Sequence, residues 1–190
     1  GLIKARKYSK GSDLGLVGEI ESVDPGPLRA ALEGGFLPVV ATIASAVDDA
    51  GSSPRSYNVN ADTAAAAIAA ALGAEKLILL TDVPGILRNI DDPGTLVREL
   101  PRSEAAALIK EGIVSKGMIP KVECCAKAVE EGVGRAHIID GRVPHSLLME
   151  LFTDAIMRDL LASSLETATV GAEGWKDVGK GPGSTAGNFI

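Results

Sequence analysis

The chain has 190 residues, of which 46% are hydrophobic and 3% aromatic, and a formal net charge of −6. This composition can bury one compact domain or two small lobes, while the acidic balance argues against non-specific binding to nucleic acid or to anionic membranes. The few aromatic side chains argue against base-stacking platforms, and no apolar run approaches the roughly 18 residues of a membrane-spanning helix.

Two short apolar runs, residues 2–6 and 14–20, flank a polar turn and predict a β-hairpin at the start of the chain. Residues 27–33 predict a helix that stops at two glycines, and residues 36–41 predict a short apolar strand after it. Residues 45–55 are rich in glycine, serine and aspartate and predict a loop.

After this loop the chain alternates between helical segments and apolar strands. Helices are predicted over residues 62–72, 103–110, 120–131 and 144–152. The runs 76–80 and 136–139 are continuously apolar, which is typical of strands buried on both faces of a parallel sheet. The alternation therefore predicts an α/β fold, a sandwich of helices around a mainly parallel sheet.

The last part of the chain, residues 155–190, lacks this alternation and predicts a disordered tail. Its run from Gly174 to Gly181 matches a Walker phosphate-binding loop except at Gly181, which replaces the serine or threonine that binds magnesium. No apolar strand precedes the run, so we reject a phosphate-binding loop there.

Two segments lie where an open α/β sheet binds its ligands, near the carboxyl ends of strands. Thr81, Asp82 and Gly85 follow the strand 76–80, and they form either a Pro-Gly turn or a nucleotide site edged by a hydroxyl and a carboxylate. Lys121 stands in the first turn of a predicted helix, where the macrodipole disfavours a cation by roughly 0.3–1 kcal/mol. A phosphate bound by backbone N–H groups and this ammonium explains the lysine, and a charge exposed to water is the alternative.

Asn58, Asn60 and Asp62 alternate along the chain just before the next helix. A helix N-cap needs only one such residue, whereas side chains at alternate positions of an extended segment share one face. We therefore interpret the three residues as part of a binding site.

The cysteines and histidines predict no metal site. Cys124 and Cys125 are adjacent, which gives neither a disulfide framework nor metal-ligand spacing and fits a reducing compartment. His137 and His145 show no zinc spacing.

Four motifs, in order and spacing, resemble those of the acetylglutamate kinases, a branch of the amino-acid kinases. They are YNVNADT (residues 57–63), LILLTDVPGIL (77–87), GMIPKV (117–122) and HIIDGR (137–142). The resemblance extends over residues 1–154. It implies an open αβα sandwich and ATP-dependent phosphorylation of the side-chain carboxylate of N-acetyl-L-glutamate, a step of arginine biosynthesis, in the bacterial cytoplasm or the plastid stroma.

The resemblance also implies roles for individual residues. Lys121 would neutralise charge on the phosphoryl group in flight, and Asp62 would orient the catalytic lysines. Asn58 and Asn60 would contact the amino-acid substrate and the phosphoryl group. The nucleotide would be held by Thr81, Asp82, Gly85, Met118 and Ile119. Magnesium would arrive on the ATP phosphates, without a cage of protein carboxylates.

The same resemblance divides the chain. Residues 1–45 correspond to a remnant of the amino-acid-binding lobe, residues 46–154 to the nucleotide-binding lobe, and residues 155–190 are unmatched. The family's glycine-rich phosphate loop, which carries its own lysine, would precede Gly1. We therefore expect a chain that lacks its N-terminal part and is inactive by itself. The family usually has two glycines before the methionine of the GMIPKV motif, and only Gly117 stands there.

The implied partners are ATP, N-acetylglutamate and, in the full-length protein, further copies of itself, with neither nucleic acid nor a membrane. The resemblance also implies arginine or a regulatory protein as a partner. His145 and Glu150 stand near the position where arginine-inhibited members of the family bind arginine, but we favour a solvated helix face for these two residues. Two other functions stay open. One is another amino-acid kinase, such as aspartokinase, glutamate 5-kinase or uridylate kinase. The other is a non-catalytic fragment that binds a nucleotide or an effector.

Overall fold

The computed structural model describes residues 1–11, 13–47, 56–89, 91–114 and 117–152. Most of the predicted loop 45–55 and all of the predicted tail 155–190 lie outside the described residues. The chain divides into two compact units, residues 1–144 and 145–190, and the second contributes one described helix, α5 (Ser146–Phe152).

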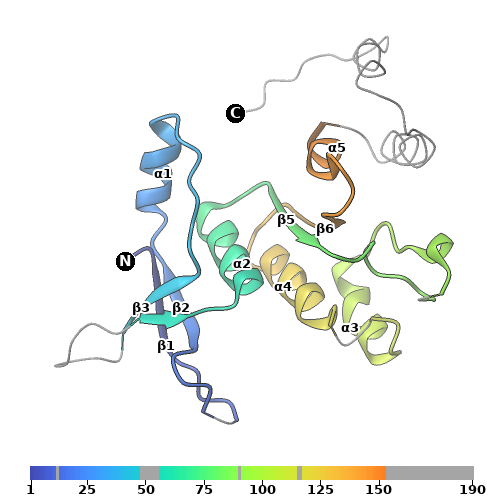
Figure 1. Ribbon diagram of the computed structural model, residues 1–190, viewed down its shortest axis with the longest axis horizontal. Coiled ribbons are helices and arrows are strands. Elements are labelled where there is room, and N and C mark those ends of the chain that lie inside the picture. The colour runs from blue at the N-terminus through green and yellow to red at the C-terminus, as the bar shows by residue number, and fades with distance from the viewer. Residues whose placement is uncertain (12, 48–55, 90, 115–116, 153–190) are drawn as a thin grey trace. The chain divides into compact units, whose positions relative to one another are not determined.

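The first unit contains a four-stranded sheet with the strand order β2-β1-β3-β4 (Figure 1). Its strands are β1 (Ile3–Lys7), β2 (Gly18–Val23), β3 (Ile43–Ala46) and β4 (Ser56–Asn58). β1 and β2 pair antiparallel, which confirms the predicted hairpin. β3 pairs parallel with β1 and antiparallel with β4, and the predicted helix α1 (Gly26–Glu33) connects β2 with β3.

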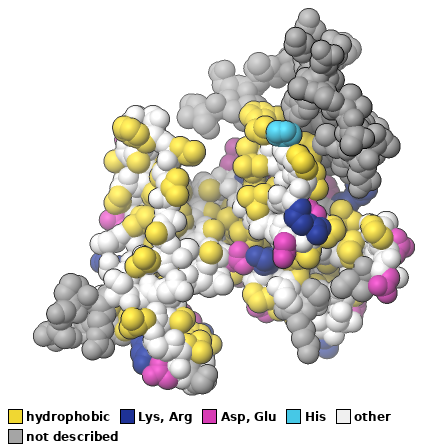
Figure 2. Space-filling view, viewed as in Figure 1, with side chains coloured by type: hydrophobic (Ala, Val, Ile, Leu, Met, Phe, Trp, Pro, Cys, Tyr) yellow, Lys and Arg dark blue, Asp and Glu magenta, His cyan; other side chains and the backbone are white. Residues whose placement is uncertain are grey.

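The strand predicted over residues 36–41 is wrong. This segment lies outside every described strand, and its Phe36, Leu37 and Val39 side chains are 71%, 89% and 93% exposed. Pro38 has no N–H to donate to a strand ladder. The chain forms β3 a few residues later instead, where the small Ala44 is fully buried against β1 and β4. Figure 2 shows hydrophobic side chains at the surface over the part of the molecule that holds α1.

A second sheet consists of β5 (Lys76–Thr81) and β6 (Arg135–Asp140), which pair parallel from Lys76 opposite Arg135 to Thr81 opposite Asp140. This pairing confirms the two predicted strands, but the prediction that both of their faces are buried is wrong. Only one face of β5 is fully covered, because Leu77 and Leu79 are 5% exposed whereas Leu80 is 53% exposed.

Two helices pack on this parallel pair, α2 (Ala61–Leu72) and α4 (Ile119–Glu130). Buried alanines at the contacts allow the helices to approach each other and the strands closely. They are Ala66, Ala69 and Ala128. A third helix, α3 (Arg102–Lys110), packs against α4. These elements confirm the predicted α/β class.

Short turns connect each helix to its strand, α2 to β5 through residues 73–75 and α4 to β6 through residues 131–134. Each strand therefore runs antiparallel to the helix that precedes it. As a result, the N-termini of α2 and α4 lie at the same end of the sheet as the carboxyl ends of β5 and β6 (Figure 1). None of the helices in the described part of the chain has the length and apolar character needed to cross a membrane.

Candidate functional site

An ion pair joins the first turns of α2 and α4. Lys121 Nζ donates a hydrogen bond to Asp62 Oδ2 at 2.9 Å, and the two side chains are 24% and 22% exposed. Partial burial weakens the screening of both charges by water, so the pair is held more firmly than an exposed one. The structure therefore brings together the two residues that the sequence singled out as catalytic.

The start of α2 explains how Asp62 reaches this position. Asn60 is the N-cap, and its Oδ1 accepts hydrogen bonds from the Thr63 backbone N–H at 3.0 Å and from Thr63 Oγ1 at 3.2 Å. Asp62 then lies in the first helical turn, where the macrodipole favours a carboxylate.

The prediction that Asn58, Asn60 and Asp62 share one face of an extended segment is therefore wrong. The extended conformation ends at Asn60, because its amide satisfies the exposed N–H groups of the helix start, and α2 begins at Ala61. Asn58 ends β4 and has an exposed side chain.

The start of α4 differs from that of α2, because no side chain caps it. Met118 is the N-cap, and its carbonyl oxygen accepts hydrogen bonds from the N–H groups of Lys121 and Val122 at 3.1 and 3.0 Å. The N–H groups of Met118 and Ile119 precede these first helical hydrogen bonds. The Met118 side chain is 5% exposed, so this residue can offer a ligand only its backbone.

Lys121 remains an unfavourable cation at a helix N-terminus. Asp62 compensates for this charge in the structure, so the lysine is neither solvated alone nor dependent on a phosphate for a partner.

A second turn of α4 places two thiols behind this ion pair. Cys124 Sγ lies 3.7 Å from Thr63 Oγ1. Burial raises the pKa of the Cys125 thiol to about 12, with smaller contributions from Cys124 and from the Asp62 carboxylate. The Cys125 thiol is therefore protonated at neutral pH and does not serve as a nucleophile.

The segment after β5 forms a tight turn. Thr81 is 8% exposed, and its hydroxyl accepts a hydrogen bond from Val83 N–H at 2.9 Å and donates one to Val83 O at 3.2 Å. Asp82 is exposed. Gly85 has a backbone φ of 133°, a value that residues with a Cβ atom rarely adopt. The Thr81 hydroxyl thus forms the turn in this structure, as the first of the two interpretations of this segment predicts. The Asp82 carboxylate stays exposed at the sheet edge.

Sequence reasoning assigned no role to two residues at the end of β6. Asp140 accepts three hydrogen bonds from Arg142, one from its backbone N–H and two from its guanidinium group, at 2.7 to 2.9 Å. The Arg142 guanidinium holds the pKa of the Asp140 carboxyl below its usual range. Their place at the carboxyl end of the second parallel strand was a signal that could have identified them.

Glu150, in the second unit, is 5% exposed. The interpretation of a solvated helix face is therefore wrong for Glu150. His145 precedes α5 with a positive φ of 62°.

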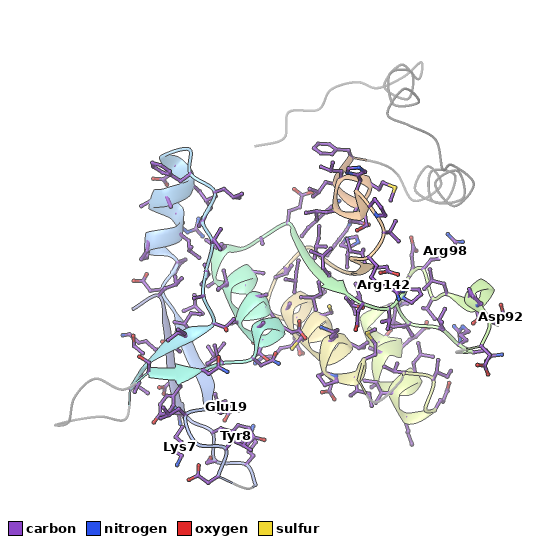
Figure 3. The ribbon with its side chains drawn as sticks, in the orientation of Figure 1. Lys7, Tyr8, Glu19, Asp92, Arg98 and Arg142 are labelled. Atoms are coloured by element: carbon purple, nitrogen blue, oxygen red, sulfur yellow. The ribbon has the colours of Figure 1, made fainter. Side chains whose placement is uncertain are left out.

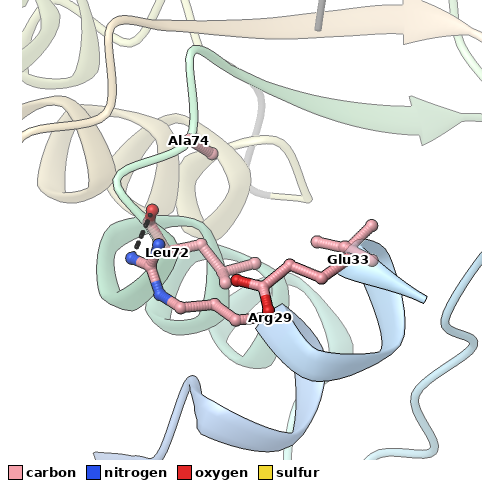
Figure 4. Close-up of a pocket in the computed structure, with 5 residues that line it drawn as sticks. Arg29, Glu33, Leu72 and Ala74 are labelled. Atoms are coloured by element: carbon pink, nitrogen blue, oxygen red, sulfur yellow. Dashed lines mark hydrogen bonds between the residues drawn. The ribbon is translucent and has the colours of Figure 1, made fainter. Parts of the chain in front are cut away.

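Two other features delimit the site. Within the described ranges there is no group of three or more His, Cys, Asp or Glu side chains that could hold a metal ion. A cavity of about 340 Å³ lies between α1 and the C-terminal end of α2, where Arg29 Nη2 donates to Leu72 O at 3.0 Å (Figure 4). Because Asp62 lies at the opposite end of α2, this cavity is separate from the ion pair.

Comparison with known protein families shows which family this chain resembles. The model of the amino acid kinase family matches residues 2–140. An acetylglutamate kinase from Synechococcus sp. (strain CC9605) is 54% identical over 154 residues, which are 81% of this chain and 51% of the relative. One from Thermosynechococcus vestitus is 54% identical over 86% of this chain and 53% of the relative. The chain thus spans about half the length of the curated relatives it matches.

Solved structures agree with this match. N-acetylglutamate synthase from Neisseria gonorrhoeae, complexed with coenzyme A and N-acetyl-glutamate, is 30% identical with a TM-score of 0.69 over 80% of this chain and 34% of that chain. The protein smu.665 from Streptococcus mutans UA159 is 31% identical with a TM-score of 0.62 over 73% of this chain and 53% of that chain. Giardia carbamate kinase, at 20% identity and a TM-score of 0.54, shares the fold.

Proposed function

Because this chain belongs to the amino acid kinase family, we propose that the protein is an acetylglutamate kinase, which transfers a phosphoryl group from ATP to the side-chain carboxylate of N-acetyl-L-glutamate in arginine biosynthesis. The names of its cyanobacterial relatives support this activity. The observation that carries the proposal is the partly buried Lys121–Asp62 pair, which lies at the sheet end where α/β proteins bind their ligands.

Phosphoryl transfer between two oxygens requires positioning and charge neutralisation rather than covalent catalysis by the protein. In the proposed reaction, Lys121 moves part of its interaction from Asp62 to the equatorial oxygens of the phosphoryl group. Its ammonium then stabilises the charge that develops between the attacking carboxylate and the leaving ADP oxygen. The N-terminus of α4, which no side chain caps, would also direct its backbone N–H groups to the same anion.

Asp62 acts as a positioning residue in this mechanism. Its carboxylate holds the Lys121 ammonium by a charge-assisted hydrogen bond of 2.9 Å, so the lysine is already oriented before substrates bind. Asn60 accepts hydrogen bonds from Thr63 through its Oδ1, which leaves its Nδ2 amide group to contact acetylglutamate. Asn58 contributes an exposed amide at the end of β4.

The nucleotide would lie along the edge formed by the ends of β5 and β6. Asp82 and Gly85 would line this site, together with Thr81 and the backbone of Met118 and Ile119. The described residues fit magnesium that arrives on the ATP phosphates, because Asp82 and Asp140 at this edge belong to no group of three or more side chains that could cage a metal ion.

We further propose that the protein works in the bacterial cytoplasm or the plastid stroma, and as a homo-oligomer. Cyanobacterial relatives support such a compartment. Binding of arginine near His145 and Glu150, or of a regulatory protein, is a finer proposal. It rests on the resemblance and on the burial of the Glu150 carboxylate.

A coupled assay with the full-length protein tests the activity. We expect ADP release that depends on N-acetylglutamate, with hydroxylamine trapping the acyl phosphate, and no turnover with aspartate, glutamate or UMP. Turnover with one of those acceptors instead would assign the protein to another branch of the family. Nucleotide binding without turnover on any acceptor would identify a non-catalytic binding module.

A further inference from the structure

The end of β6 holds a guanidinium group in a fixed orientation. Arg142 Nε donates to Asp140 Oδ1 at 2.9 Å and Nη2 donates to Asp140 Oδ2 at 2.7 Å, so both carboxylate oxygens accept from one fork. The Arg142 backbone N–H also donates to Asp140 Oδ1 at 2.9 Å. Such a bidentate pair fixes the plane of the guanidinium as well as its position.

The backbone beneath this pair is equally constrained. Asp140 is the register partner of Thr81, and Gly141 N–H donates to Thr81 O at 2.8 Å, which extends the parallel ladder past the end of β6. A Cβ at Gly141 would lie 3.3 Å from Leu80 Cβ and from Thr81 O. Arg142 therefore emerges directly beside the turn that begins at Thr81, at the end of β5 (Figure 3).

The charges at this edge require a cation if a nucleotide is to bind there. Asp82 follows β5 and Asp140 is the last residue of the neighbouring β6, and two carboxylates would repel the phosphates of ATP. The fork from Arg142 neutralises Asp140. Hydrogen bonding to Asp140, together with the charges of Asp140 and Asp82, raises the pKa of Arg142, so both acids favour its charged form.

The guanidinium has donors beyond those that Asp140 uses. Of its five N–H groups, the fork to Asp140 uses one on Nε and one on Nη2. The Arg142 side chain is 59% exposed, whereas that of Asp140 is 14% exposed. The carboxylate is thus the less exposed partner, and the arginine presents its remaining donors at the sheet edge.

We propose that Arg142 is a further nucleotide-binding residue, which contacts the phosphate groups of ATP, and that Asp140 is the positioning residue that orients it. This inference rests on the proposed function, because it assumes a nucleotide at the ends of β5 and β6. Arg142 would give the phosphate groups a planar, bidentate hydrogen-bond donor. Lys121 is a point charge and does not provide such a donor.

The test uses the full-length protein with Arg142→Gln, Arg142→Lys and Asp140→Asn. Arg135→Gln is the matched control, because Arg135 is an exposed arginine at the amino end of the same strand. KM values for ATP and acetylglutamate are measured, together with the inhibition constants of ADP and adenosine. Melting temperatures show whether each variant is folded.

We expect Arg142→Gln to raise the KM for ATP and the inhibition constant of ADP by about tenfold or more, with adenosine inhibition unchanged. Arg142→Lys restores part of the loss, because it keeps the charge without the fork, and it serves as the test if the glutamine variant does not fold. Asp140→Asn shifts the same two constants in the same direction by a smaller factor. Arg135→Gln matches wild type.

Two results would overturn the inference. One is an Arg142→Gln enzyme whose KM for ATP and inhibition constant of ADP equal those of the Arg135→Gln control. The other is an equal loss for ADP and adenosine, which would assign Arg142 to the structure of the edge rather than to phosphate binding. Failure of the proposed function is distinguishable, because wild-type protein would then leave acetylglutamate unphosphorylated while calorimetry with ADP still reports on Arg142.

Discussion

Lys121 Nζ and Asp62 Oδ2 lie 2.9 Å apart, although 59 residues separate them in the chain. Each belongs to the first turn of a helix, and the two helices pack against each other on one parallel strand pair. Asp62 is favoured at its helix start, whereas Lys121 is disfavoured at its own. The carboxylate therefore holds a cation at the place where a helix would otherwise bind an anion.

Replacing Lys121 with alanine in the full-length protein should lower kcat by about 10²–10³-fold and change the KM for ATP much less. An interaction that strengthens mainly in the transition state affects turnover rather than ground-state binding. Lys127→Ala is the matched control, because Lys127 lies on the same helix with its side chain 66% exposed. Steady-state kinetics in which Lys121→Ala raises only the KM for ATP would refute the catalytic assignment.

Asp62→Asn should lower kcat by about 10²-fold, because a neutral amide holds the Lys121 ammonium more weakly and allows it to move. The amide also loses a favourable macrodipole interaction of about 0.3–1 kcal/mol, so the melting temperature should fall by only a few degrees. If the melting temperature falls in this way while the activity equals that of wild type, Asp62 serves only the start of α2.

The helices and the parallel strand pair were predictable because their signals are local. Gly73 ends α2 with a left-handed φ of 65°, and Pro120 stands in the first turn of α4. The strand predicted over residues 36–41 failed because an apolar run does not show which segment the sheet selects. That selection depends on Ala44, whose burial requires contacts with strands far away in the chain.

The residues of the site were predictable from local signals, but the contacts between them were not. Lys121 and Asp62 stood out because each occupies a helix start, but their contact depends on how two helices pack. The Asp140–Arg142 fork was missed because two residues so close in sequence form it only when the chain turns directly after the strand. The prediction for Asn60 failed at a local interaction. The hydrogen bond from the Thr63 N–H to the Asn60 side chain makes Asn60 the N-cap of α2 and ends the extended segment there.

Gly85→Ala should destabilise the turn after β5. The φ of 133° at Gly85 is unfavourable for a residue with a Cβ, and the added atom would lie 3.1 Å from Leu96 Cδ1. We expect a loss of about 1–3 kcal/mol in the free energy of unfolding, together with weaker ATP binding. Gly117→Ala is the control, because open space surrounds that position. Chemical denaturation that gives both variants the same stability would contradict this account of the turn.

Cys125 should resist alkylation in the folded protein. With a pKa of about 12, only on the order of one thiol in ten thousand is ionised at pH 8. Iodoacetamide at pH 8 followed by mass spectrometry of a Cys124→Ser variant measures this directly, with the urea-unfolded protein as the reactive reference. Labelling of Cys125 at the same rate in both states would show that the thiol is not protected.

The same shift predicts a dependence of stability on pH. Because the pKa of Cys125 is higher in the folded protein than its ordinary value of 9.0, folding favours the protonated thiol. This contribution is fully present below pH 9 and is lost as the pH rises towards 12. A Cys125→Ala variant should therefore lose less stability than wild type between pH 9 and 10.5, as measured by denaturant unfolding.

Two substitutions of Asn60 should separate its structural role from its proposed contact with substrate. Asn60→Ala removes the acceptor for the Thr63 N–H and should cost about 1 kcal/mol, which lowers the melting temperature by roughly 2–4 °C. Asn60→Asp keeps the acceptor, and aspartate caps a helix as well as asparagine does. Its melting temperature should therefore stay near that of wild type.

The aspartate variant nevertheless replaces the Nδ2 donor with a second carboxylate oxygen. Since acetylglutamate and the phosphoryl group are both anionic, a carboxylate at Asn60 repels them where an amide would donate a hydrogen bond. We expect Asn60→Asp to raise the KM for acetylglutamate by at least tenfold without loss of stability. A stable Asn60→Asp enzyme with wild-type kinetics would limit Asn60 to its role as the N-cap of α2 and would move the amino-acid site away from this helix start.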